Sequence, residues 1–151
     1  MDNERQDLSD DELCRMHFRD LLQTLTGGRP FIFVVMSFDD RWDVYERIKK
    51  VADEQFEMAC VRADELKSGG HDLLDKIHFL IERADFAVAE ISRRSPNVYY
   101  EVGYTVASRD RPLLLVESTS EVPADMRGLE VVDTAATREA CTHWKPTWAP
   151  T

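Results

Sequence analysis

The chain has 151 residues, with 19 Lys and Arg against 29 Asp and Glu, so its formal net charge is −10. That length fits one domain, alone or with an extension, and is enough to bury a hydrophobic core. The apolar content of 43% is ordinary for a globular chain and argues against general disorder. The acidity argues against general binding of nucleic acids or anionic membranes, but a small anionic ligand needs only a local positive cluster.

Cysteine and histidine spacing gives no sign of a metal site or a disulfide framework. Cys14, Cys60 and Cys141 are odd in number and far apart, and no C-x-x-C or H-x-x-x-H pair occurs. No run of 18 apolar residues is present, and the N-terminus is acidic and polar, the reverse of a signal peptide. We therefore expect a cytoplasmic protein with no metal and no cofactor.

Residues 1–29 are expected to form a helical extension ahead of the main domain. Ser9, with Glu12 three residues later, has the pattern of a capping box. Leucines and a methionine follow at near-helical spacing, and Gly27–Gly28 and Pro30 end the helix. The sequence leaves open whether this helix covers an edge of the sheet or packs against a partner.

Apolar segments alternate with amphipathic ones over residues 30–136. The run 31–36 has no polar side-chain atom except the Met36 sulfur, as expected for a strand buried on both faces. Further strands are expected at 58–61, 86–89, 112–116 and 129–132, with helices over about 41–55, 72–83 and 97–108. In the second of these helices Leu73, Leu74 and Ile77 are expected to face inward. Residues 137–151, with two Trp and two Pro, are expected to form an irregular tail.

Strands that alternate with helices at this spacing predict parallel β-α units with right-handed crossovers. The expected fold class is α/β, a flavodoxin-like three-layer fold with a five-stranded parallel sheet and an extra N-terminal helix. In such folds ligands bind at the carboxyl ends of the strands, where the strand order reverses. That rule selects the segments 36–40, 62–72, 90–101 and 117–121.

The third of these segments is the richest in polar groups. Asn97, directly after Pro96, is the expected helix cap, so that backbone N–H groups of the first turn face the crevice. Ser95 adds a hydroxyl and Arg93 and Arg94 add positive charge, which suits a phosphate or carboxylate. A capped helix with two solvated arginines fits the same residues equally well.

Glu101 follows Asn97 by four residues, so the two share one helix face. Tyrosines and a valine surround it in sequence, and burial among them would raise the pKa of its carboxyl group. The alternative is an exposed glutamate on the outer face. Gly103 costs the helix about 1 kcal/mol relative to Ala, which predicts close packing against the sheet or room for a ligand.

From Phe31 to about Val116 the chain resembles the nucleoside 2-deoxyribosyltransferase-like superfamily, which is related to TIR-type domains. The resemblance is carried by V-M-S-F after the first strand and by 62–64, 72–77, 84–85 and 96–104, of which the last, P-N-V-Y-Y-E-V-G-Y, is the most specific. It implies that Glu101 is the nucleophile on the sugar. The stretch 89–92 with Ser95 also resembles 2'-deoxynucleoside 5'-monophosphate N-glycosidases, which implies that Ser95 binds a 5'-phosphate. Glu90 stands where many relatives have Asp, and it either lines the pocket or holds the loop.

The implied chemistry is cleavage of an N-glycosidic bond through an oxocarbenium-like state. A carboxylate beneath the anomeric carbon stabilises that charge or forms a glycosyl-enzyme intermediate. A second acid should protonate the leaving base or hold a sugar hydroxyl. Asp75 is the first choice because the family has an acid on this helix, and the rivals are Asp39, Asp64 and Asp72.

Other residues are assigned to substrate binding. Phe38 is placed to stack on the base, and Gly69 and Gly70 can let the backbone approach the sugar or phosphate, although a plain flexible loop fits them nearly as well. The candidate substrate-binding residues are Ser37, Phe38, Asp39, Asp64, Gly69, Gly70, Glu90, Ser95, Asn97 and Tyr100.

The expected function is that of an N-glycosidase or ribosyltransferase that cleaves the base–sugar bond of a nucleotide. The alternatives are a non-catalytic, nucleotide-sensing TIR-like signalling module and a purely structural interaction domain. The expected partner is a small-molecule nucleotide, either a nucleoside monophosphate or NAD, with no long nucleic acid and no membrane. A homo-oligomer is expected because in related enzymes a neighbouring subunit helps to close the pocket.

Overall fold

A computed structural model describes residues 10–37, 42–66, 73–108, 110–118 and 122–134 of the chain. Its elements are α1 (Asp10–Thr26), β1 (Phe31–Val35), α2 (Trp42–Phe56), β2 (Ala59–Arg62), the short 3-10 helix η1 (Ala63–Glu65), α3 (Leu73–Arg83), β3 (Phe86–Glu90), α4 (Pro96–Ala107), β4 (Leu113–Val116), the 3-10 helix η3 (Ala124–Met126) and β5 (Val131–Asp133). The predicted capping box at Ser9 and the tail 137–151 lie outside the described residues. Within the described ranges, no helix is both long and apolar enough to span a membrane.

The five strands form one parallel sheet in the order β2-β1-β3-β4-β5. The chain steps from β1 outward to β2 and then crosses back to β3 on the other side of β1. The strand order therefore reverses between β1 and β3, where Val35 pairs with Ala89 near the carboxyl ends. This topology confirms the predicted flavodoxin-like α/β fold with its extra N-terminal helix.

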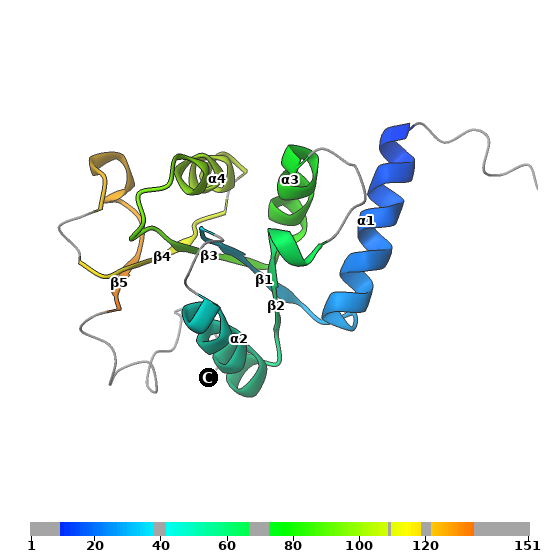
Figure 1. Ribbon diagram of the computed structural model, residues 1–151, viewed down its shortest axis with the longest axis horizontal. Helices are drawn as coiled ribbons and strands as arrows, with labels where there is room; N and C mark the ends of the chain where they lie inside the picture. The colour runs from blue at the N-terminus through cyan, green and yellow to red at the C-terminus, as the bar shows by residue number, and fades with distance from the viewer. Residues whose placement is uncertain (1–9, 38–41, 67–72, 109, 119–121, 135–151) are drawn as a thin grey trace, which may run out of the picture.

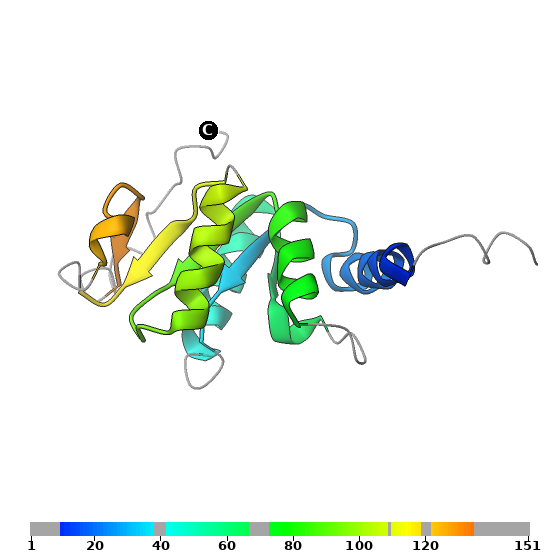
Figure 2. The same cartoon turned by 90° about the horizontal axis from the view of Figure 1, so that it is seen from above.

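Helices cover both faces of the sheet, which is why the central strands are apolar throughout. α3 and α4 lie on one face and α2 on the other (Figure 1), and α3 and α4 run side by side (Figure 2). Phe33 and Val35 of β1 pack into the core under α3 and α4, whereas Ile32 and Val34 pack into the core under α2. All five residues of β1 are buried, as its unbroken apolar run predicts.

α1 lies at the β2 end of the sheet, where it contacts β2 and α3 (Figure 1). Phe18 carries the contact, since it is 1% exposed and its ring centroid lies 5.4 Å from that of Phe79 in α3. Of the two roles considered for this helix, the structure thus places it against the edge of its own sheet.

Three predicted details are wrong. Leu73 and Leu74 are exposed, although Ile77 on the same stripe is buried. They occupy the first turn of α3, and the buried residues of this helix begin only at Lys76. β5 begins at Val131 rather than Leu129, because the Leu129 N–H instead donates to the carbonyl of Met126 at 3.1 Å. Arg62, expected in a loop, is the buried last residue of β2.

We predict that Phe18→Ala lowers the free energy of unfolding by about 3–5 kcal/mol, because it removes a fully buried ring and leaves a cavity beside Phe79. Leu25→Ala is the matched control on the same helix, and since Leu25 is 39% exposed its loss should stay near or below about 1 kcal/mol. Urea unfolding measures both. Equal small losses would show that α1 is not part of the core.

Candidate functional site

The carboxyl ends of β1 and β3 bring two predicted site residues to one edge of the sheet. Ser37 follows β1 and is half-buried, and Glu90 is the buried last residue of β3. The Glu90 carboxylate accepts a hydrogen bond from the Ser92 N–H at 2.8 Å. The Ser92 hydroxyl in turn accepts the Glu117 N–H at 3.0 Å, which ties the loop after β3 to the end of β4. Glu90 therefore stabilises the loop that leads into α4 through this hydrogen bond.

α4 begins differently from the prediction, because Ser95 rather than Asn97 is its cap. Ser95 has an extended backbone, Pro96 occupies the first helical position, and the Ser95 carbonyl accepts the Tyr99 N–H at 3.1 Å. Proline suits that position because it has no N–H to satisfy and its φ is already helical. Asn97 is exposed within the first turn, and the half-buried Ser95 hydroxyl makes no capping hydrogen bond.

The two arginines ahead of α4, Arg93 and Arg94, are exposed. A turn closes between them and β3, since the Arg94 N–H donates to the Ile91 carbonyl at 3.2 Å. Arg94 has a φ of 50°, in the left-handed region that non-glycine residues seldom occupy. The backbone thus reverses direction immediately before the Ser95 cap.

Glu101 is the buried carboxylate of the site. It lies in α4 and is only 8% exposed, among the buried residues Val98, Val102 and Thr105 of the same helix. Within the described part of the chain, no hydrogen bond or ion pair reaches its carboxylate. Burial raises the pKa of the Glu101 carboxyl group from 4.5 to about 7. The exposed position considered from the sequence is therefore excluded.

The outer side of α4 is fastened to α3 by aromatic residues. The exposed Tyr100 hydroxyl is hydrogen-bonded to Nε2 of His78 at 2.9 Å, and the His78 ring stacks on Tyr104 with the centroids 4.0 Å apart. Tyr104 donates to the Glu82 carboxylate at 2.9 Å. Tyr100, predicted to bind substrate, is thus engaged with α3.

Gly103 does not have the close packing against the sheet that its cost to the helix predicts. It is exposed, and a Cβ added there would meet no atom within 4 Å. The glycine faces away from the sheet, on the side of α4 opposite the buried stripe that includes Val102. Nothing in the described structure explains why this position is glycine.

The candidate second acids lie in different surroundings. Asp75 is exposed in the first turn of α3 and makes no hydrogen bond or ion pair with a described residue. Asp64 is engaged by Arg62, whose Nε lies 2.7 Å from Oδ1 while Nη2 contacts Oδ2. The remaining predicted positions lie outside the described residues, namely Phe38, Asp39, Gly69, Gly70 and Asp72.

A charged cluster at the end of β2 was not predicted from the sequence. Arg62 is 4% exposed, and its guanidinium carbon lies 4.5 Å from the centre of the Trp42 ring and 5.4 Å from that of Tyr45. Lys76 of α3 is also buried; burial lowers the pKa of its ammonium group, and nearby Asp64 partly offsets that effect. The available signal was Arg62 directly after an apolar strand with an acid two residues later.

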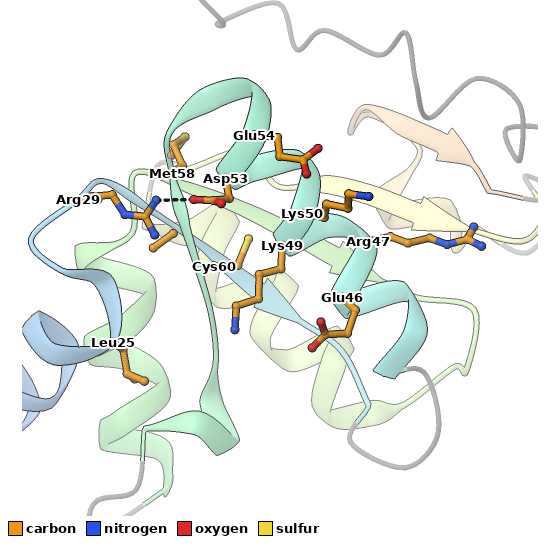
Figure 3. Close-up of a pocket in the computed structure, with 11 residues that line it drawn as sticks. Leu25, Arg29, Glu46, Arg47, Lys49, Lys50, Asp53, Glu54, Met58 and Cys60 are labelled. Carbon is orange, nitrogen blue, oxygen red and sulfur yellow. Dashed lines mark hydrogen bonds and ion pairs between the residues drawn. The ribbon is translucent and has the colours of Figure 1, made fainter.

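A hollow of about 590 Å³ lies away from these residues, beside β2 and between α1 and α2 (Figure 3). Its apolar lining includes Leu25, Met58 and Cys60, and the other lining residues include both basic and acidic side chains. Arg29 and Asp53 form an ion pair across it at 2.6 Å. Burial raises the pKa of the Cys60 thiol to about 12, which disfavours the thiolate form. Of the predicted site residues that the structure describes, none lines this hollow.

Within the described ranges, no group of three or more His, Cys, Asp or Glu side chains is arranged to hold a metal ion. No protein-family model matches the sequence, and no curated protein matches it.

We predict that Glu101→Gln raises the free energy of unfolding by up to about 3 kcal/mol at pH 8 and by less than about 1 kcal/mol at pH 5. The folded pKa is raised, so the wild-type protein loses stability as the pH rises from about 4.5 through about 7. The glutamine side chain of the variant is neutral at every pH, so the variant does not lose stability over this range. Urea unfolding at both pH values measures the difference.

Glu54→Gln, an exposed acid on α2, is the control and should change stability little at either pH. A loss of stability in Glu101→Gln at pH 8 would contradict the assignment of an unpaired buried carboxylate.

Proposed function

We propose that the protein cleaves the base–sugar bond of a nucleotide, as an N-glycosidase or ribosyltransferase, with Glu101 as the nucleophile. The observation that carries this proposal is the buried, unpaired Glu101 carboxylate near the carboxyl edge of a flavodoxin-like sheet. Its burial opposes folding at neutral pH, and such perturbed groups cluster at functional sites. The resemblance of 96–104 to the nucleoside 2-deoxyribosyltransferase-like superfamily supports the same role.

The proposed reaction has two steps. The Glu101 carboxylate attacks the anomeric carbon as the bond to the base breaks, and the electron pair of that bond leaves on the base nitrogen, which takes up a proton. Water, which gives up a proton to the second acid that was deprotonated in the first step, or the nitrogen of a second base then attacks the same carbon and releases the Glu101 carboxylate. The low-polarity surroundings of Glu101 strengthen its interaction with the positive charge that develops on the sugar.

A second acid supplies the proton for the leaving base. We assign this role to Asp75, in the first turn of α3, because α3 runs beside α4 and both helices begin at the same edge of the sheet (Figure 2). Asp64 suits the role less well, because the Arg62 guanidinium already occupies both of its carboxylate oxygens.

The β3–α4 loop favours a phosphorylated substrate. The Ser95 hydroxyl is not used in capping, Arg93 and Arg94 are exposed ahead of it, and the first turn of α4 presents N–H groups. A phosphate at this position would receive a hydroxyl, backbone donors and positive charge from one loop. This supports a nucleoside monophosphate as substrate over a free nucleoside.

One observation favours the alternative of a nucleotide-sensing TIR-like module. Asp75 is exposed and Asp64 is ion-paired, so within the described residues no second acid is held against Glu101. A pocket of this kind binds a nucleotide without turnover if no residue delivers the proton to the leaving base.

We predict that the wild-type protein releases free base from at least one nucleotide in a panel of nucleoside monophosphates, deoxynucleoside monophosphates and NAD. Glu101→Gln should lower that rate at least about a thousandfold, because the amide cannot form the glycosyl bond. The value of kcat/KM should rise with pH through about 7 as Glu101 loses its proton. Chromatography of the released base measures all three quantities.

Glu54→Gln again serves as the control and should retain full activity. Turnover in Glu101→Gln equal to that of the wild type would contradict the assignment of the nucleophile. Nucleotide binding without base release would favour the sensing module.

A further inference from the structure

We infer that residues 137–151 dock on the face of the sheet that carries α2 and cover its strands β4 and β5. The surface concerned, which we call the β4–β5 face, consists of Leu115 of β4 and Val132 of β5, with Val44, Ile48 and Val51 of α2 beside them. The inference is independent of the proposed reaction, because Glu101 belongs to α4 on the opposite face of the sheet (Figure 1).

Strand β4 is fully covered on one face and only partly covered on the other. Leu114 and Val116 are 0% exposed and pack into the core under α3 and α4, whereas Leu115 between them is half-buried. Leu115 pairs in register with Val132 of β5, which is also half-buried, and both pack at the margin of the core under α2. The α2 face therefore leaves apolar side chains partly open to solvent at its β5 end.

Helix α2 has a charged side and an apolar side. The charged side, with Lys49 and Asp53, lines the hollow beside the edge strand β2 (Figure 3). Val44, Ile48 and Val51 share the other side at helical spacing, and all three are half-buried. Since the charged side faces β2, the apolar side faces across the sheet toward β4 and β5. It continues the apolar surface that Leu115 and Val132 begin.

The width of the sheet leaves room for one further element on this face. Four strand spacings of about 4.8 Å separate β2 from β5, so the sheet is about 19 Å across. A packed helix covers about 10 Å. Among the described elements α2 is the only helix on its face, and its most extensive contact with a strand is with β2 (Figure 1). Parallel sheets occur almost only with both faces covered, so another segment is required over β4 and β5.

The chain itself supplies that segment. The Thr134 N–H donates to the Val116 carbonyl at 2.7 Å, so the chain is held against β4 where it leaves the sheet. Residues 137–151 begin a few positions later, after a connection of usual length. They include Trp144 and Trp148, and such rings bury about 150–250 Å² each. A tethered segment has a high effective concentration at this face, whereas a second copy would lose translational and rotational freedom on docking.

Acrylamide quenching of tryptophan fluorescence tests the inference in the full chain. In a Trp42→Phe variant, Trp144 and Trp148 are the only indoles. We expect quenching of the folded protein to be at least about threefold weaker than quenching in urea, because packed rings are shielded from solvent. Leu115→Lys in the same background should raise quenching at least about twofold, because the docked segment would have to bury a charge.

Three further variants separate loss of docking from loss of folding. Val106→Lys is the matched control, because Val106 lies on α4 and is 44% exposed, and it should leave quenching unchanged. Val44→Lys places the charge on α2 and should raise quenching as Leu115→Lys does. Leu115→Ala removes apolar surface without adding a charge and should raise quenching by a smaller factor. Far-UV circular dichroism checks that each variant is folded.

Light scattering over a range of protein concentrations identifies the occupant of the β4–β5 face. We expect shielding of the two indoles that does not depend on concentration, and the same molar mass in Leu115→Lys as in the parent. Shielding that disappears on dilution together with a fall in molar mass would overturn the inference in favour of a second copy. Quenching equal to that in urea would also overturn it, as would equal quenching in folded Leu115→Lys and Val106→Lys variants. Base release plays no part in these measurements, so failure of the proposed reaction leaves the test intact.

Discussion

The parallel pairing of β1 with both β2 and β3 is the constraint on which the rest of the structure depends. Parallel strands send every following loop to one edge of the sheet, so the ends of β1, β2 and β3 lie together. At the opposite edge the Phe31 N–H donates to Asp85 Oδ2 at 2.9 Å, which fixes the first residue of β1 against the start of β3. This arrangement determines where Glu90, Arg62 and Glu101 lie.

Most of the fold could be predicted from the sequence because strands buried on both faces leave an unmistakable apolar run. The errors fall where tertiary context decides. Proline at position 96 moved the cap of α4 from Asn97 to Ser95, since its ring favours the first helical position. Periodicity placed Leu73 on the inner stripe of α3, but the period does not say at which residue of a stripe burial begins, and Leu73 in the first turn is exposed.

In the candidate site, too, some features could be predicted from the sequence and others could not. For Glu101 the sequence allowed both a buried and an exposed position, and the structure buries it beside Val98, Val102 and Thr105 of the same helix. The charged cluster at the end of β2 could not be predicted in this way, because Arg62 belongs to β2 and Lys76 to α3, and only the folded chain brings α3 against η1, the short helix that follows β2. The charge of −10 is likewise uneven, with seven acids against three arginines in the first 20 residues.

Glu101 is an unpaired carboxylate that is costly to bury, and we propose that it serves to hold a sugar. Rapid quenching of the protein with a cleavable nucleotide, followed by peptide mass spectrometry, tests this most directly. The predicted result is a transient sugar adduct on the peptide that contains Glu101, absent from Glu101→Gln. An adduct on another residue, or base release by Glu101→Gln at the wild-type rate, would contradict it.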